Sequence, residues 1–184
     1  MIVVMFEDLK SQLEAIPGHA TAFEPGQHLF HLGDKVTVVH FIEMGQAQLV
    51  RHQTDGSLLV LQRAVPGSIL AEASLYSDVY HCDAIAVAPT RTLAVSKQAI
   101  RMRLTTTPAF SEAWALHLAH EVQRARLHAE ILSLKKVAAR LDAWIVWNGG
   151  QAPEKGEWKS VAEQVGVSPE AFYRELARRR PQQI

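Results

Sequence analysis

The stretch PAFSEAWALHLAHEVQRARLHAEIL, residues 108–132, decides how the rest of the chain is organised. Its composition predicts a helix, because good helix formers dominate it and neither Gly nor Pro occurs after its first residue. Pro108 suits the first turn of a helix, where its missing N–H group is not needed. At ~1.5 Å per residue the helix would be about 37 Å long, longer than most helices of globular proteins.

The predicted helix has two apolar stripes. One repeats at every fourth position and includes Trp114, Leu118 and Val122, which we expect to pack on the preceding part of the chain. The other then needs a partner, and a second copy of the same helix is the simplest one. The sequence therefore predicts a homodimer whose seam contains four apolar residues: Leu116, Leu127, Ile131 and Leu134.

Length and composition indicate a folded protein of one large or two small domains. The chain has 184 residues, 48% of them hydrophobic, which is ordinary for a protein with a core. No apolar run reaches the ~18 residues of a membrane span, and the N-terminus MIVVMFEDLK has no basic region typical of a secretory signal. Cys82 is the sole cysteine, which excludes an internal disulfide. We expect a cytoplasmic protein without membrane contact.

The net charge of zero conceals an asymmetry between the two parts of the chain. Residues 1–100 contain 6 basic and 10 acidic side chains, whereas residues 101–184 contain 13 basic and 9 acidic ones. The first part therefore carries −4 and the second +4. This distribution favours an acidic sensor or scaffold followed by a region that meets a polyanion.

Before the long helix, the chain consists of short apolar segments separated by turns. A short helix is expected at residues 5–16, and another at 97–105. Between them, pairs such as Pro25-Gly26, Asp55-Gly56 and Pro66-Gly67 mark turns. Such spacing predicts an antiparallel barrel or jelly roll. The candidate strands are 22–23, 27–30, 36–42, 47–51, 58–62, 84–87 and 92–95.

After the long helix, the sequence predicts a helix-turn-helix. A helix at 134–148 ends at Asn148-Gly149-Gly150, and a shorter one follows at 157–165. Gly166 then allows a tight turn, and Ser168 can cap a second helix that starts with Pro169 and runs to about residue 179. Two helices joined by such a turn are typical of a DNA-binding motif, although a hairpin used only for packing remains an alternative.

The second helix of this motif would enter the major groove of double-stranded DNA. Glu170 and Arg174 lie one turn apart, and Arg can bind guanine while Glu can accept from cytosine. The two could also merely pair with each other. Hydroxyl and lysine side chains suit phosphate contacts, and the Arg178–180 run adds non-specific attraction. The predicted DNA-binding residues are Lys159, Ser160, Ser168, Glu170, Tyr173, Arg174 and Arg178.

Together these parts resemble the Crp/Fnr (catabolite-activator-like) transcription regulators. The resemblance rests on FEPGQHLFHLGD at 23–34, PGSILAEASLY at 66–76 and GVSPEAFYR at 166–174. It implies an α+β fold, with a β-roll sensor domain at 1–107, a dimerisation helix at 108–133 and a helix-turn-helix domain at 134–184. It also implies RNA polymerase as a partner. The two-stranded wing that family members carry after the recognition helix has no counterpart in the five residues 180–184.

The second motif resembles the family's phosphate-binding cassette, but one charge is missing. Members that bind cyclic nucleotides follow the cassette Glu, here Glu72, with an Arg ten residues later. Cys82 and Asp83 occupy this region, and neither can replace a guanidinium opposite a phosphate. We therefore expect no cyclic AMP binding. The predicted effector pocket comprises Glu72, Ala73, Ser74, His81, Cys82, Asp83 and Arg124.

The effector remains open at this stage. One alternative is a haem-, metal- or thiol-based sensor that uses His81 and Cys82, and the candidate metal ligands are His81, Cys82, His117 and His120. Alternatively, Cys82 is a small buried apolar residue and the histidines are surface groups. An enzyme of the cupin type is disfavoured, because His28 and His31 lack the His-x-His spacing. A regulatory dimer that does not bind DNA is the remaining alternative.

Overall fold

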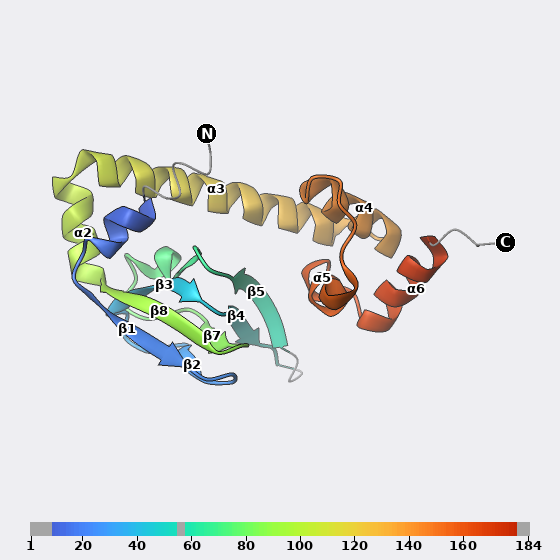
Figure 1. The fold of residues 1–184 in the computed structure, drawn as a ribbon, viewed down its shortest axis with the longest axis horizontal. Helices are drawn as coiled ribbons and strands as arrows, with labels where there is room; N and C mark the ends of the chain where they lie inside the picture. Colours follow the sequence, from blue (N-terminus) through green and yellow to red (C-terminus); the bar gives the residue numbers. More distant parts are fainter. Residues whose placement is uncertain (1–8, 55–57, 180–184) are drawn as a thin grey trace. The chain divides into compact units, whose positions relative to one another are not determined.

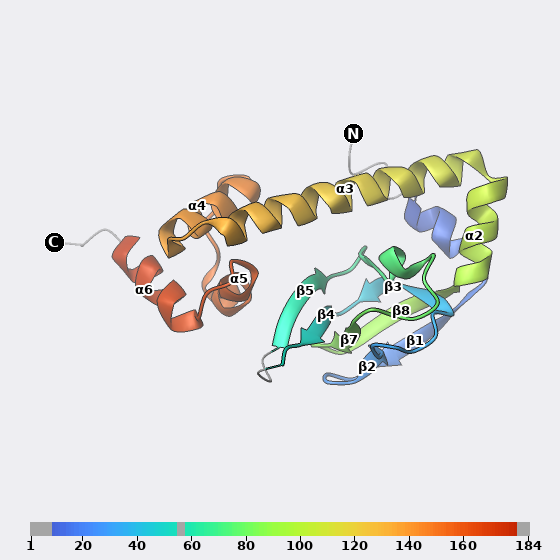
Figure 2. The same cartoon turned by 180° about the vertical axis from the view of Figure 1, so that it is seen from behind.

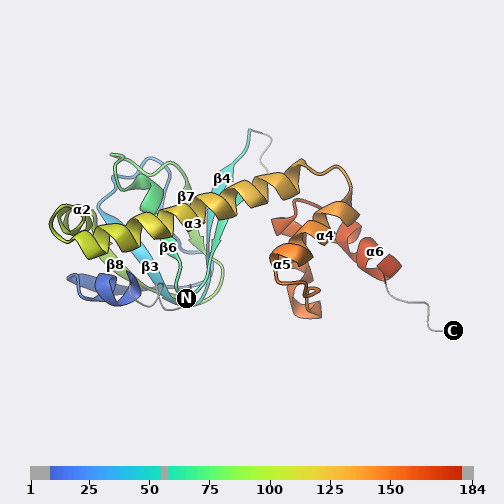
Figure 3. The same ribbon diagram turned by 90° about the horizontal axis from the view of Figure 1, so that it is seen from above.

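The computed structural model of the chain describes residues 9–54 and 58–179 (Figure 1). The chain divides into two compact units, residues 1–117 and 118–184, and the boundary lies within one helix. This helix, α3 (Pro108–Ser133), is continuous (Figure 3). Among the described residues, no helix combines the length and the apolar character needed to cross a membrane.

The first unit is built from two four-stranded antiparallel sheets (Figure 2). One has the order β1-β8-β3-β6 and the other the order β2-β7-β4-β5. This confirms the predicted β-roll. The strands are β1 (Gly18–Phe23), β2 (His28–Phe30), β3 (Val38–Met44), β4 (Ala47–His52), β5 (Leu58–Ala64), β6 (Ile69–Leu70), β7 (Asp83–Ala86) and β8 (Thr90–Ser96).

The alternation of side chains across each strand builds the core of this unit. Phe30, Ile42, Leu49 and Leu70 meet in it, and Phe30 stacks on Tyr80 with ring centroids 3.8 Å apart. The pairing of β4 with β5 confirms the predicted hairpin. Its turn, Asp55-Gly56, lies outside the described residues, as does the first part of the helix expected at 5–16, of which residues 9–14 are helical.

Two helices follow the β-roll. Ser96 caps α2 (Lys97–Thr106) by accepting from the Ala99 N–H group, 3.4 Å away. The start of α3 is anchored by apolar burial, since Phe110 and Trp114 are buried. Val122, expected to be covered in the same way, is instead 47% exposed.

The second unit contains the end of α3, then α4 (Val137–Trp147), α5 (Trp158–Gln164) and α6 (Pro169–Arg179), with a short 3₁₀-helix η2 (Lys155–Glu157) before α5. Its core joins Ile131, Leu141, Val161 and Phe172. The assignment of Ile131 to a dimer seam is therefore wrong: the residue is fully buried within its own unit, where a partner cannot reach it.

Candidate DNA-binding surface and effector pocket

The turn between α5 and α6 has the geometry expected of a helix-turn-helix. Gly166 has a φ of 64°, and the Val167 N–H group donates to the Ala162 carbonyl at 3.0 Å, which closes the end of α5. A Cβ at Gly166 would lie 2.6 Å from Leu132 Cδ2, so glycine also allows close packing against α3. Ser168 Oγ then accepts from the Ala171 N–H group at 3.3 Å and caps α6.

One face of α6 is held in the core while the other carries polar side chains. Phe172 is fully buried, with Ala162 and Val165 of the preceding helix and turn in the same cluster. On the other face Glu170 and Arg174 are exposed, and Tyr173 is 42% exposed. The three side chains predicted to contact DNA from this helix are therefore exposed on the face away from the core.

Glu170 is held in its ionised form at the start of α6. Its own backbone N–H group and the Ser168 hydroxyl lower the pKa of this exposed carboxyl, and the charge of Arg174 contributes in the same direction. A carboxylate fixed at this point can accept a hydrogen bond and cannot donate one. This is the character required to contact the amino group of a base.

Two of the side chains predicted to contact phosphate, Lys159 and Ser160, differ in their exposure to solvent. Lys159 is exposed. Ser160 is half-buried, and its Oγ accepts from Gln164 Nε2 at 3.2 Å, so only its own O–H group is left to donate to a phosphate. Gln164 in turn accepts from Trp144 Nε1 at 3.0 Å, which makes Ser160 part of the internal packing as well.

The arginines at the end of α6 have separate roles. Arg178 has a 72% exposed side chain, 3.0 Å from Glu175 Oε2. Arg179, however, is engaged inside the unit: it contacts Asp142 Oδ1 at 2.6 Å and Glu175 Oε1 at 2.7 Å, and it donates to the Ala138 carbonyl. Arg179, predicted to add non-specific attraction to DNA, is thus also tied into the packing of its own unit. Arg180 and the wing position, 180–184, lie outside the described residues.

Arg140 is a structural residue that sequence reasoning missed. From α4 its guanidinium donates to four carbonyls: Leu134 at 2.6 Å, Leu132 at 2.9 Å, Val165 at 3.0 Å and Gly166 at 2.8 Å. The carbonyls of Leu132 and Leu134 lie at the end of α3 and directly after it. The carbonyls of Val165 and Gly166 belong to the turn of the helix-turn-helix. A helix end leaves its last carbonyls without helical partners, and an Arg can satisfy several of them. Arg140 thereby fixes the helix-turn-helix to the end of α3.

In the first unit, the cassette begins with an unusual backbone conformation. Ala71 has φ 73° and ψ 13°, the left-handed region, and is followed by the 3₁₀-helix η1 (Glu72–Ser74). Among the residues that the structure describes, Ala71 is the one non-glycine residue whose φ is positive. Ser74 is buried, and its Oγ forms a 3.0 Å hydrogen bond with His81 Nδ1. The fold therefore brings Ser74 and His81 of the predicted pocket together.

We expect the Ala71→Gly substitution to stabilise the protein by roughly 0.5–1 kcal/mol, because glycine adopts the left-handed conformation without steric cost. Ala73, two residues later and inside η1, provides a matched control. Ala73→Gly is expected to destabilise the protein by a similar amount. Urea unfolding of the three proteins measures both effects. Equal destabilisation by the two substitutions would contradict a strained Ala71.

Cys82 is a core residue. It is 2% exposed within the β-roll cluster, and its burial raises the pKa of the thiol, with Arg51 acting in the opposite direction. A thiol with a raised pKa is protonated at neutral pH and is a poor metal ligand. His81, next to it on the chain, is exposed, so the two side chains point apart. The structure therefore does not bring the candidate ligands His81 and Cys82 together.

The other predicted ligands and pocket residues also lie elsewhere. His117 is buried near Trp114, whereas His120 and Arg124 belong to the second unit, where Arg124 pairs with Glu121 at 3.0 Å. Within residues 9–54 and 58–179, side chains able to hold a metal ion in a group of three or more occur at one place. This group contains none of the four predicted ligands. It consists of His28, His31 and Asp83.

Comparisons with known proteins agree with this architecture. Residues 20–106 match the family model of the cyclic nucleotide-binding domain. Among solved structures, FixK2 from Bradyrhizobium japonicum superposes with a TM-score of 0.74 at 14% identity, covering 89% of this chain and 84% of that one. The chain has the fold of the Crp/Fnr regulators. The β-roll, α3 and helix-turn-helix correspond to the parts of that fold.

Two further Crp/Fnr-type structures show the same likeness. The regulator CLP of Xanthomonas campestris, described as responsive to c-di-GMP, has a TM-score of 0.68 at 16% identity, over 95% of this chain and 90% of its own. The catabolite activator protein of Thermus thermophilus has a TM-score of 0.57 at 22% identity, over 94% and 82%. A search of the curated proteins returned no significant match.

Proposed function

We propose that the chain is a sequence-specific, DNA-binding transcription regulator of the Crp/Fnr type that acts as a homodimer. The observation that carries this proposal is the capped helix α6, whose outer face presents Glu170, Tyr173 and Arg174 from a rigid core. Arg and Glu side chains at such a position can read base edges in a major groove, as donor and acceptor respectively. The Crp/Fnr fold supports the assignment.

DNA would be recognised in two layers. Lys159 and Arg178 would contact phosphates and fix the register of the motif. Arg174 and the ionised Glu170 would then select the bases, Arg as a donor and Glu as an acceptor. Binding by exposed cations must weaken as salt rises, because phosphate counterions are released. Footprinting on genomic fragments tests this assignment: a protected site is expected, and protection of none would contradict it.

The dimer would form along an apolar stripe of α3 that differs from the predicted one. Six small or apolar side chains on α3 are exposed and recur at three- and four-residue intervals, as on one helix face. Small residues let two helices approach closely, and two helix-turn-helix units then meet two half-sites of DNA. The stripe comprises Ala115, Ala119, Val122, Ala125, Ala129 and Leu132.

We expect Val122→Glu to raise the dimer dissociation constant by at least about thirtyfold, because each protomer would bury a carboxylate beside its symmetry mate. Val146 on α4 is 77% exposed and outside the stripe, so Val146→Glu is the matched control. Sedimentation equilibrium measures both. Loss of the dimer in both variants, or in neither, would contradict the assigned seam.

The effector pocket is proposed to respond to something other than cyclic AMP. Cys82 stands where cyclic-nucleotide binders have arginine, and its side chain is turned into the core instead of toward a ligand. Ser74 and His81, joined by a hydrogen bond, are two of the polar groups at this place. RNA polymerase remains a proposed partner through the resemblance to the family.

A further inference from the structure

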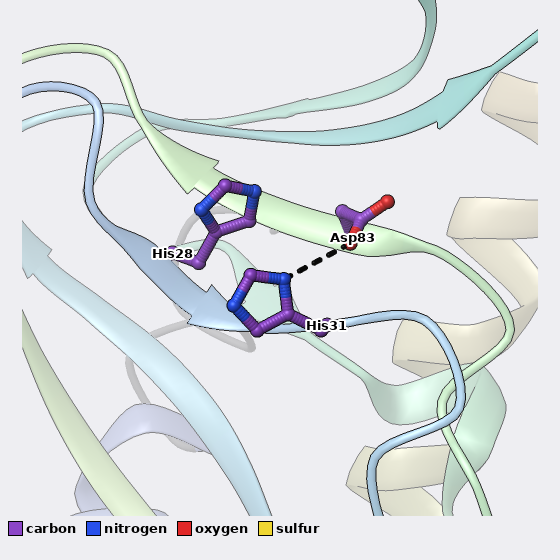
Figure 4. A group of neighbouring side chains, drawn as sticks. All are labelled: His28, His31 and Asp83. Carbon is purple, nitrogen blue, oxygen red and sulfur yellow. Dashed lines mark ion pairs between the residues drawn. The ribbon is translucent and has the colours of Figure 1, made fainter.

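Three metal-ligating side chains meet on the β-roll at a place that the proposed function does not use. His28 begins β2, His31 follows the end of the same strand, and Asp83 begins β7. The strands β2 and β7 pair antiparallel, with Phe30 opposite Ala84, and this pairing brings the distant Asp83 beside the histidines. Figure 4 shows the His28 and His31 rings next to each other, with the His31 ring directed at the Asp83 carboxylate.

The geometry of the group is close to that of a ligand set. His31 Nδ1 lies 3.4 Å from Asp83 Oδ1, and one ligand atom from each of the three residues lies within 4.8 Å of the others. Zinc binds imidazole nitrogen and carboxylate oxygen at about 2.0–2.2 Å, so adjacent ligands of a tetrahedral ion are roughly 3.3–3.6 Å apart. The observed His31–Asp83 distance equals this tetrahedral edge. The His28 ring, whose ligand atom lies within 4.8 Å of the other two, would have to approach them to complete the set.

The carboxylate and the turn are held in place before any ion arrives. The Asp83 side chain is 13% exposed, and its Oδ1 accepts from the Leu32 N–H group at 3.1 Å. The turn after β2 is closed by the His31 N–H group, which donates to Asp34 Oδ2 at 2.9 Å. The Gly33 N–H group donates to the Tyr80 carbonyl at 2.9 Å and so joins this turn to the segment before β7. Fixed ligands lose little freedom on binding, which favours affinity.

A simple ion pair does not account for the whole group. An ion pair between His31 and Asp83 would need no second imidazole. Yet His28 stacks on His31, with ring centroids 4.1 Å apart and an interplanar angle of 26°.

We propose that His28, His31 and Asp83 bind a divalent transition-metal ion of the zinc type, with water as the fourth ligand. Two imidazoles favour such an ion over Ca²⁺ or Mg²⁺, which prefer ligand sets made of oxygen. The bound ion links the turn after β2 to the first residue of β7. It thereby restrains the backbone directly after His81 and Cys82, at the edge of the predicted effector pocket.

The test uses the full chain, stripped with a chelator and titrated with Zn²⁺ in a calorimeter. Binding of one ion per protomer is expected, together with a rise of about 5 °C or more in the melting temperature at saturation. His28→Gln, His31→Gln and Asp83→Asn should each weaken binding at least about tenfold. Asn at position 83 still accepts from Leu32, which separates loss of a ligand from loss of the fold. His52→Gln, an exposed histidine on β4, is the control and should bind like the parent protein.

Co²⁺ provides a second readout that does not depend on stability. A tetrahedral Co²⁺ site gives intense visible absorption, which should appear in the parent and in the His52→Gln protein and be lost in the three ligand variants. Unchanged Zn²⁺ affinity in those variants would identify an adventitious ion and overturn the proposal. Absence of binding at micromolar Zn²⁺ would overturn it too, and would leave a histidine–aspartate ion pair. DNA binding is measured separately, so either result leaves the proposed regulator function untouched.

Discussion

Replacing Arg174 with alanine is expected to reduce the preference of the protein for its operator over unrelated DNA by about 1–3 kcal/mol, or roughly 5- to 150-fold. The exposed guanidinium on the outer face of α6 can contact two acceptors of a guanine at once, and alanine cannot. The loss should be confined to the base pair that Arg174 reads. Gel shifts with operator variants at that position measure it.

Lys159→Ala supplies the comparison, because Lys159 is exposed on α5 and is proposed to contact phosphate. It should weaken binding to all sequences about equally and lower the salt slope by about one unit. If Arg174→Ala also weakened all sequences equally, its role in reading bases would be wrong and it would be a second phosphate contact.

Arg140→Met is expected to lower the free energy of unfolding of the C-terminal unit by about 2–4 kcal/mol. The substitution keeps much of the side-chain length but removes the donors that serve the four carbonyls at the end of α3 and in the turn before α6. Carbonyls left without partners in a partly buried place carry a desolvation cost. Urea unfolding followed by tryptophan fluorescence measures this loss, since Trp144, Trp147 and Trp158 lie in this unit and Trp114 alone lies in the other.

Arg140→Lys should fall between the parent protein and the methionine variant, since an ammonium group cannot span four carbonyls as a guanidinium does. The control is Arg124→Met, because Arg124 is 57% exposed and pairs only one turn away, with Glu121. Its effect should stay within about 0.5 kcal/mol. Equal losses for Arg140→Met and Arg124→Met would contradict the role of Arg140.

Features encoded by neighbouring residues could be predicted from the sequence. The turn at Gly166 and the cap at Ser168 depend on backbone freedom and on a side chain three residues from its partner, and both were found as expected. The alternation and turn pattern also gave the β-roll. The strand β6 was missed because its two residues, Ile69 and Leu70, carry no period of their own and pair with distant β3.

Features that depend on distant partners could not be predicted. Periodicity shows that α3 has apolar stripes, but it does not show which stripe packs against other parts of the chain. Ile131, for example, is buried in the core of the second unit. The partners of Arg140 lie as far as 26 residues away. Likewise, Asp83 reaches His28 and His31 only through the pairing of β2 with β7, so the sequence could suggest two of the three ligands at most.

The most direct test of the proposed function is the affinity of the purified protein for its footprinted site and for a scrambled duplex, measured at about 50 and 200 mM salt. We expect the site to be bound about a thousandfold more tightly or better, and both affinities to fall as salt rises. Equal affinity for the two duplexes, or no binding to either at low salt, would contradict a sequence-specific DNA-binding regulator.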